Sequence, residues 1–361
     1  MSRAVLVTRP DEDVVEEAEA LATAAGYERV GVLTQRFLGR ARFGIGAGKA
    51  EELSRLVREA GADVVLFDAP LGAAQAYALA KVCKVEVRDR EKVILEIFAK
   101  RASTAEAKLQ VQLAEVEYEL PRAKDRVRMA RMGEQPGFFG LGKYEVDVYT
   151  RMMKSRMGIL RRKVREVAKR REIFRRRREK FMFPTIALAG YTASGKTTLF
   201  NLLTGESKEA DAGVFTTLSP TTRAIALGER KALVTDTVGF ISGLPAYLVE
   251  AFKSTLEEIS FASVVLLLLD VSQTNEKFLR SYESSSAALE DFQVGPWTTI
   301  VVLNKCDLVP AEVIEEKRRL LGPVDAVAIS SVTGQGVGAL LGAVEARLSE
   351  EGTEKVTARR R

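Results

Sequence analysis

The stretch that decides the fold is residues 183–203, FPTIALAGYTASGKTTLFNLL. A short apolar run at 186–189 opens into a glycine-rich loop, and residues 198–203 have the pattern of the first turns of a helix. This order of strand, glycine loop and helix is typical of a phosphate-binding P-loop. Backbone N–H groups of such a loop, with the positive end of the helix behind them, surround nucleotide phosphates. The stretch therefore predicts a nucleotide-binding α/β domain.

The polar and glycine residues of this loop have predicted roles. Gly190 and Gly195 permit a close approach of the backbone to a phosphate. Lys196 is expected to place its charge on the β and γ phosphates, and the Thr197 hydroxyl is expected to ligate Mg²⁺. The predicted phosphate-binding residues are Gly190, Thr192, Ser194, Gly195, Lys196, Thr197 and Thr198.

Two later segments are typical of a guanine-nucleotide switch. Residues 215–220, FTTLSP, predict a loop with Phe215 in which Thr217 reaches Mg²⁺ and the γ phosphate only when a triphosphate is bound. Asp236 follows the apolar run 232–234 and is expected to touch Mg²⁺ through water, and the amide of Gly239 is expected to sense the γ phosphate. The predicted catalytic residues are Lys196, Thr217 and Gly239, and the predicted metal ligands are Thr197, Thr217 and Asp236.

A third pair of segments predicts recognition of guanine. Asn304, Lys305 and Asp307 follow the apolar strand predicted at 299–303. The Asp307 carboxylate can accept two hydrogen bonds from the N–H edge of guanine, a donor pair that adenine does not present. Ser330 and Ser331, after the strand predicted at 324–329, are expected to give a backbone N–H to the guanine carbonyl. The ordered set predicts a domain that binds GTP or GDP with Mg²⁺.

Composition restricts the chemistry. The 361 residues include no histidine, which excludes Ser-His and Cys-His nucleophiles and histidine metal ligation. The 55 Lys and Arg against 49 Asp and Glu give a net charge of +6, which fits an anionic partner or a solvated surface. Cys83 and Cys306 indicate no disulfide, and no apolar run is long enough to span a membrane. We expect a cytoplasmic monomer.

The N-terminal segment alternates strand and helix patterns. Its predicted strands cover 4–8, 29–34, 63–67 and 85–87, and its predicted helices cover 14–25, 49–60 and 72–82. This order predicts a small parallel sheet with helical crossovers. Within it, residues 43–49, FGIGAGK, form a second glycine loop without P-loop spacing. Either this is a tight turn from strand to helix with glycine at positive φ, or it contacts RNA or phosphate.

Residues 92–180 have helical periodicity throughout. Two apolar seams predict an antiparallel hairpin, formed by Leu109, Leu113, Val116, Leu120, Ala123 and Val127 and by Met153, Met157, Leu160, Val164 and Val167. Pro121 lies within the first seam, so this helix is expected to kink or end near Leu120. Residues 133–143, rich in glycine, predict an exposed tip loop.

The second hairpin helix is strongly basic. Its cations are Arg161, Arg162, Lys163, Arg165, Lys169, Arg170, Arg171, Arg175, Arg176, Arg177, Arg178 and Lys180. Few acids intersperse to neutralise them. The alternatives are a solvated helix face and a contact with nucleic-acid phosphates, and the cluster favours the second.

The chain resembles the HflX family of GTPases over nearly its whole length. The resemblance rests on GYTASGKTTLFNLLTG, FTTLSPTTRAI, DTVGFISGLPAYLVEAFKSTLEE and NKCD, and upstream on GIGAGKAEEL and RDREKVILEIFAKRASTAEAKLQVQLAEVEYELPR. It implies binding to the large ribosomal subunit and its rRNA, GTP hydrolysis stimulated by the ribosome, and in bacteria the splitting of stalled ribosomes. By motif it assigns Lys196, Thr197, Thr217, Asp236 and Gly239 to phosphate and Mg²⁺, and Asn304, Lys305, Asp307 and Ser331 to guanine.

Two positions depart from the pattern of related GTPases. Where those proteins often carry an asparagine that helps to hold an activating potassium ion, this chain has Ala193. Phe240 occupies the place of the glutamine that orients water in signalling GTPases. An apolar ring cannot orient water, so intrinsic hydrolysis is expected to be slow and to be stimulated by a partner.

The sequence therefore predicts three parts and a tail. These are an N-terminal α/β domain at 1–98, a basic helical hairpin at 99–181, a doubly wound P-loop GTPase domain at 182–349 and a basic tail at 350–361. The predicted function is a GTP-controlled switch that binds the ribosome. The alternatives are an enzyme that remodels RNA with either nucleotide, and a GTPase-timed module that binds another protein.

Overall fold

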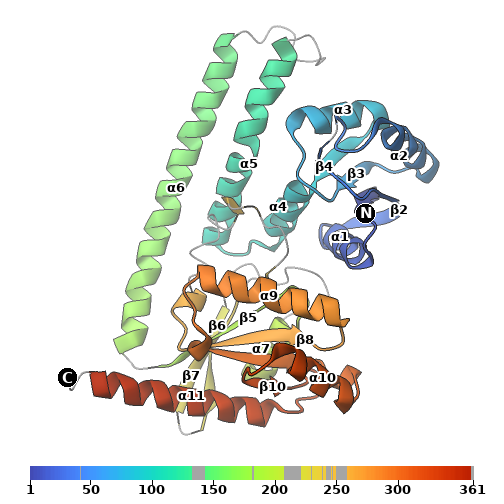
Figure 1. Cartoon of the computed structure of the whole chain (residues 1–361). Helices are drawn as coiled ribbons and strands as arrows, with labels where there is room; N and C mark the ends of the chain where they lie inside the picture. Colours follow the sequence, from blue (N-terminus) through green and yellow to red (C-terminus); the bar gives the residue numbers. More distant parts are fainter. Residues whose placement is uncertain are drawn as a thin grey trace. The chain divides into compact units, whose positions relative to one another are not determined.

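The computed structural model describes residues 1–358 except 41, 132–142, 181–182, 207–220, 229, 238, 241–244, 246 and 249–257. Within helices it describes no side chains at 124–131, 143–147, 170–180 and 351–358. The chain divides into two compact units (Figure 1). The first comprises residues 1–167 and 244–251, and the second comprises residues 168–243 and 252–361. The division of the chain into the predicted domains stays a prediction.

The first unit contains the predicted parallel sheet, in the strand order β2-β1-β3-β4. Its strands are β1 (Ser2–Thr8), β2 (Tyr27–Thr34), β3 (Val64–Phe67) and β4 (Glu86–Asp89). Its helices are α1 (Glu12–Ala24), α2 (Ala47–Ala60), α3 (Ala73–Cys83) and α4 (Arg90–Arg101). Inward residues such as Val5, Leu53 and Leu79 form the core between the sheet and helices α2 and α3. Strands and helices lie where the alternating pattern predicts them.

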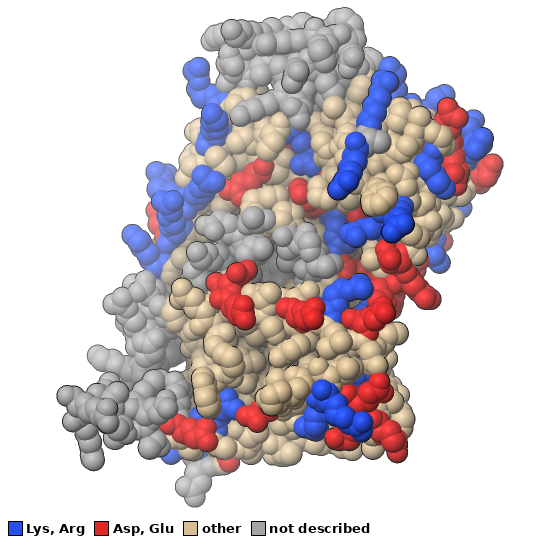
Figure 2. All heavy atoms as spheres, in the orientation of Figure 1, with Lys and Arg blue, Asp and Glu red and all other residues tan. Residues whose placement is uncertain are grey.

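Two long helices follow, α5 (Ala105–Arg131) and α6 (Lys143–Lys180). Their predicted seams meet in one apolar cluster, in which Leu113, Val116 and Leu160 are buried. The predicted tip loop lies outside the described residues, apart from Lys143. Lys and Arg side chains lie along the described part of α6 (Figure 2), and those at 161–163 are exposed. The basic side chains predicted at 170–180 lie outside the described residues.

Of the two outcomes that Pro121 predicts, an end of the helix near Leu120 is wrong, because α5 continues through Pro121 to Arg131; a kink at this position stays a prediction. A proline inside a helix costs about 3 kcal/mol. Contacts on either side of it hold the helix: the Tyr118 hydroxyl donates to Asp89 Oδ1 at 3.0 Å, and the Arg122 guanidinium donates to Asp89 Oδ2. Charge-assisted hydrogen bonds are the stronger kind, and through them Asp89, which is only 3% exposed, connects both flanks of Pro121 to β4.

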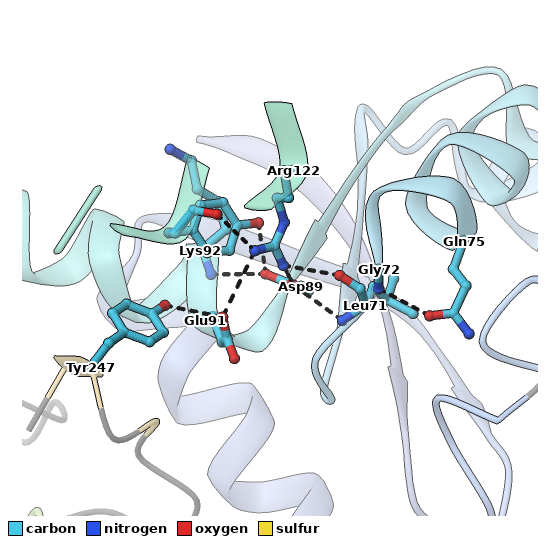
Figure 3. A network of polar contacts seen from close by, with 9 residues as sticks. Leu71, Gly72, Gln75, Asp89, Glu91, Lys92, Arg122 and Tyr247 are labelled. Atoms are coloured by element: carbon cyan, nitrogen blue, oxygen red, sulfur yellow. Dashed lines mark hydrogen bonds and ion pairs between the residues drawn. The ribbon is translucent and has the colours of Figure 1, made fainter. Parts of the chain in front are cut away.

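Asp89 also organises the backbone around it (Figure 3). Its carboxylate accepts the amide of Lys92 at 2.9 Å, which caps α4, and the amide of Leu71 at 3.2 Å. Arg122 completes the network by donating to the carbonyl of Leu71 at 2.9 Å. One buried carboxylate thus joins β4, α4, α5 and the loop before α3.

The second unit contains a six-stranded sheet in the order β10-β9-β8-β5-β7-β6, parallel except for β6. The strands are β5 (Thr185–Gly190), β6 (Thr221–Leu227), β7 (Arg230–Asp236), β8 (Val264–Asp270), β9 (Thr299–Asn304) and β10 (Ala326–Ala328). The helices include α7 (Lys196–Thr204), α9 (Asn275–Asp291), α10 (Ala311–Leu321) and α11 (Val337–Ala358), with short 3-10 turns η1 (Pro296–Thr298) and η2 (Cys306–Leu308).

Helices cover both faces of this sheet, as a doubly wound fold requires. Leu199 and Phe200 of α7 and Leu340 of α11 pack on one face, and α9 covers the other (Figure 1). Strand β8 is buried along its whole length, as its continuous apolar run predicts. The segment predicted as a basic tail from residue 350 begins as part of α11.

Two further expectations concern the chain as a whole. In the described part of the chain, no helix is long and apolar enough to cross a membrane. The two cysteines, Cys83 and Cys306, are buried free thiols. Burial raises the pKa of the Cys83 thiol to about 11, so the protonated thiol is the favoured form in the core.

Candidate nucleotide-binding site

The P-loop connects β5 to α7 through backbone conformations that require glycine. Gly190 has φ of 140° and Gly195, at the N-cap of α7, has φ of 95°. A Cβ on Gly195 would also overlap the side-chain amide of Asn304. The loop therefore turns back over the start of the helix, with its amides at the carboxyl edge of the sheet, as the motif predicts.

Lys196 is buried under this loop. Its ammonium donates to the carbonyls of Gly190 at 3.0 Å and Tyr191 at 2.7 Å. Burial lowers the pKa of Lys196 to about 8, and the negative charge of Asp236 opposes this shift. A bound polyanion would compensate the buried charge directly.

Thr197 and Asp236 come from different elements and meet at the site. Thr197 Oγ1 donates to Asp236 Oδ2 at 3.1 Å, and the side chains are 8% and 0% exposed. A hydroxyl and a carboxylate are oxygen ligands of the kind that Mg²⁺ takes beside phosphate oxygens. In addition, Ser194 Oγ is a buried polar atom without a hydrogen-bond partner among the described residues. The residues present therefore fit a magnesium nucleotide.

The segment after β7 lies along the P-loop. The amide of Phe240 donates to Gly190 O at 3.0 Å, and the amide of Thr192 donates to Phe240 O at 2.8 Å. A Cβ on Gly239 would stand 2.9 Å from Lys196 Nζ. Gly239 thus passes close to the lysine that the motif assigns to the γ phosphate, and Phe240 is 8% exposed.

Asn304 connects three loops of the site. Its Nδ2 donates to Ser194 O at 2.7 Å, and its Oδ1 accepts both the amide and the hydroxyl of Ser331, at 3.0 and 2.8 Å. The side chain is 1% exposed. All of these contacts hold protein groups together, so the geometry gives Asn304 a positioning role. The contact with guanine that the sequence predicts for Asn304 stays a prediction.

Lys305 and Asp307 stand at the rim of the same loop. Lys305 has φ of 67°, and its ammonium forms an ion pair with the buried carboxylate of Asp270. Asp270 in turn accepts the amide and hydroxyl of Ser272. Asp307, at η2, is exposed. The carboxylate predicted to read guanine is therefore accessible to a base.

The amides after β10 differ from the expectation. The amide of Ser330 donates to Gln335 O at 3.0 Å, and that of Ser331 donates to Asn304 Oδ1. Both amides predicted for the guanine carbonyl therefore have protein acceptors. The next amide along the chain is that of Val332, a residue that is 75% exposed. Sequence alone cannot show which of these amides hydrogen-bonds to Asn304, because that depends on how the two loops meet in the fold.

The remaining predicted residues divide into two groups. Thr192, Ser194 and Thr198 lie at the P-loop and the start of α7, where the motif predicts them. Phe215 and Thr217 lie outside the described residues. Ala193 has φ of 61°, a left-handed conformation that glycine and asparagine adopt more readily than alanine.

Comparison with known proteins identifies the family. GTPase HflX of Thermococcus kodakarensis is 45% identical over 305 residues, which is 84% of this chain and 69% of that protein. GTPase HflX of Methanocaldococcus jannaschii is 41% identical over 322 residues, which is 89% of this chain and 78% of that protein. The chain belongs to the HflX family of GTPases. Membership of this family makes it an enzyme that hydrolyses GTP.

Three family models match successive parts of this HflX-family chain. They are described as GTP-binding GTPase N-terminal at residues 12–99, GTP-binding GTPase middle region at 101–178 and 50S ribosome-binding GTPase at 185–305. Among solved structures, a GTP-binding protein from Sulfolobus solfataricus in complex with GDP is 25% identical. It aligns with 97% of this chain and 99% of that one, at a TM-score of 0.53.

Proposed function

We propose that this HflX-family GTPase is a GTP-controlled switch that binds the large ribosomal subunit through ribosomal RNA. The match of residues 185–305 to the 50S ribosome-binding GTPases carries this proposal. The charge of α6 supports an RNA contact, because residues 148–167 contain one Glu and seven cations, Arg151, Lys154, Arg156, Arg161, Arg162, Lys163 and Arg165. Such a surplus of exposed cations attracts a nucleic-acid backbone.

The proposed nucleotide contacts follow from the geometry of the site. Lys196 neutralises the β and γ phosphates, and Thr197 and Asp236, together with Thr217, hold Mg²⁺. When bound, Mg²⁺ neutralises charge that develops on the phosphates during hydrolysis. The amide of Gly239 detects the γ phosphate beside Lys196.

The proposed base contacts divide between two residues. Asp307 accepts hydrogen bonds from the N–H edge of guanine, and the amide of Val332 donates to the guanine carbonyl. Asn304 fixes the distance between the P-loop and the Ser331 loop, and so positions both base contacts. Guanine would therefore be held between η2 and the loop after β10.

The experiment is sedimentation of the full chain through a gradient with separated large and small ribosomal subunits. We expect co-sedimentation with the large subunit in the presence of a non-hydrolysable GTP analogue, and weaker association with GDP. Equal association with both nucleotides would contradict control by GTP. Absence of association in either state would contradict the proposed function.

A salt titration tests the RNA contact of α6. Changing Arg162, Lys163 and Arg165 to Gln is expected to reduce the dependence of binding on salt, by roughly 0.9 in the logarithmic slope for each lost phosphate contact. The matched control changes Arg55, Arg58 and Lys81, three exposed cations of α2 and α3, to Gln as well. If the salt titration of the α6 variant superimposes on those of wild type and the control variant, an RNA contact by α6 is contradicted.

A further inference from the structure

The loop between β2 and α2 combines arginines with an exposed aromatic ring. Residues 35–49, QRFLGRARFGIGAGK, contain four cations and no acid. Arg36, Arg40 and Arg42 are exposed, and none of them forms an ion pair within the part of the chain that the structure describes. Lys49 differs, because it pairs with Glu52 at 3.0 Å. Among the described residues, therefore, no carboxylate neutralises the three arginines.

The backbone of this loop is held in place by hydrogen bonds. The amide of Gly39 donates to Gly44 O at 2.8 Å, which closes a tight turn with Arg40 and Arg42 at its tip. Gln35 accepts the amide of Gly46 at 3.2 Å and donates to Phe37 O at 2.6 Å. The two ends of the loop are thereby joined.

Apolar residues of the loop anchor it to the core. Ile45 is fully buried, and Leu38 and Phe43 pack against the core of the first unit. Gly44 has φ of 74°, and a Cβ there would stand 2.8 Å from the ring of Phe67. The glycine loop is therefore a tight turn between strand and helix, with Gly44 at the positive φ. This agrees with the first of the two alternatives that its sequence leaves open.

Phe37 is the residue that this packing does not explain. Its neighbours Leu38 and Phe43 face the core, whereas Phe37 is 62% exposed. The Arg36 guanidinium lies 5.5 Å from the Phe37 ring centre, and the Arg42 guanidinium lies 5.4 Å from that of Phe43. Exposed arginines interleaved with an aromatic ring form a surface on which an unpaired base stacks while phosphates pair with the guanidinium groups.

We infer that Arg36, Phe37, Arg40 and Arg42 form a contact site for single-stranded RNA, with a base stacked on Phe37. This inference rests on the proposed function, in which the partner is ribosomal RNA, and it assigns a second contact besides α6. Duplex RNA fits the site less well, because its bases are already stacked on one another. A protein partner with an acidic surface would use the arginines but would not require the ring.

The experiment measures binding of the full chain to a labelled polyadenosine oligonucleotide and, separately, to large ribosomal subunits. Phe37→Leu keeps an apolar side chain but removes the ring, and is expected to weaken oligonucleotide binding about tenfold. Phe37→Tyr is expected to bind within about twofold of wild type, because its ring also stacks. Trp297→Ala, which removes an aromatic residue that is 82% exposed in the second unit, is the control and should have no effect.

A second variant, which tests the charges, changes Arg36, Arg40 and Arg42 to Gln together. The logarithmic salt slope of oligonucleotide binding should fall by roughly 0.7 for each lost phosphate contact, whereas Phe37→Leu should leave it unchanged. Thermal unfolding of each variant checks that the loop change leaves the first unit folded. The Arg55, Arg58 and Lys81 variant again serves as the charge-matched control.

The outcomes separate the inference from the proposed function. Equal oligonucleotide binding by wild type and Phe37→Leu, or no binding by wild type, would overturn the inference even if large subunits bind normally. Subunit binding that needs the arginines but tolerates Phe37→Leu would indicate a protein contact and would overturn it as well. Loss of subunit association in every nucleotide state would instead refute the proposed function, while the oligonucleotide result would still decide the loop.

Discussion

The hydroxyl of Tyr247 donates a hydrogen bond to Oε2 of Glu91 across 3.0 Å, although 156 positions separate the two residues in the sequence (Figure 3). Tyr247 follows shortly after Phe240, whose backbone pairs with the P-loop in the second unit. Residues 244–251, however, belong to the first unit. The chain therefore enters the first unit soon after the loop that carries Gly239, and Tyr247 is bound there.

Replacing Tyr247 by Phe removes this hydrogen bond and leaves Glu91, which is half-buried, with fewer partners. We expect the free energy of unfolding of the first unit to fall by about 1.5–3 kcal/mol, the range for a hydrogen bond to a charged group. Chemical denaturation, monitored by fluorescence, measures this change in the free energy of unfolding. Tyr149→Phe, on an exposed part of α6, is the control. A change of only a few tenths of a kcal/mol in Tyr247→Phe would show that water replaces the hydroxyl.

Glu91 also predicts a dependence of stability on pH. Burial and the nearby Asp89 charge raise the pKa of Glu91 in the folded chain. A raised pKa means that its contribution to stability is complete below the unfolded pKa and is lost as pH rises through the folded pKa. The stability of Glu91→Gln relative to wild type should therefore increase from about pH 4 upward and then level off.

Glu86→Gln provides a control of opposite sign. A hydrogen bond from Arg88 lowers the pKa of Glu86, so its contribution is present above the unfolded pKa and is lost as pH falls. The stability of this variant relative to wild type should therefore decrease as pH rises. If the two variants have parallel pH profiles, the assignment of the Glu91 shift to burial is wrong.

Hydrolysis of GTP should be slow in the isolated protein. Phe240 follows Gly239 and pairs with the P-loop through its backbone, and its ring has no hydrogen-bonding group that could orient the attacking water. Addition of large ribosomal subunits should accelerate hydrolysis by favouring the conformation in which Thr217 and Gly239 contact the γ phosphate. Single-turnover assays with and without subunits measure both rates. Rapid turnover by protein free of ribosomes would contradict this expectation.

The parts of the structure that sequence predicts well are those fixed by local pattern. The P-loop, with Gly190, Gly195 and Lys196, follows from the order of strand, glycine loop and helix. The hairpin seams follow in the same way from helical periodicity, which places Leu113 and Val116 on one face of α5 and Leu160 and Val164 on one face of α6. Such signals need no knowledge of the rest of the chain.

The parts that sequence does not predict depend on contacts between distant residues. The continuation of α5 through Pro121 depends on Asp89, which lies in another element. The commitment of the Ser331 amide to Asn304, which transfers the proposed guanine contact to Val332, depends on how two loops meet. Local propensity carries no information about either partner, so tertiary contacts decide both cases.

The central claim is that guanine nucleotide at this site controls binding to the large subunit, and Asp307→Asn tests it most directly. The variant replaces an acceptor of the guanine N–H edge by an amide that can donate to the carbonyl of xanthine at the same position. Gradient sedimentation with large subunits should show association of wild type with the non-hydrolysable GTP analogue. The variant should lose that association and recover it with the corresponding xanthosine analogue. Association of the variant with the GTP analogue at wild-type strength would contradict the account.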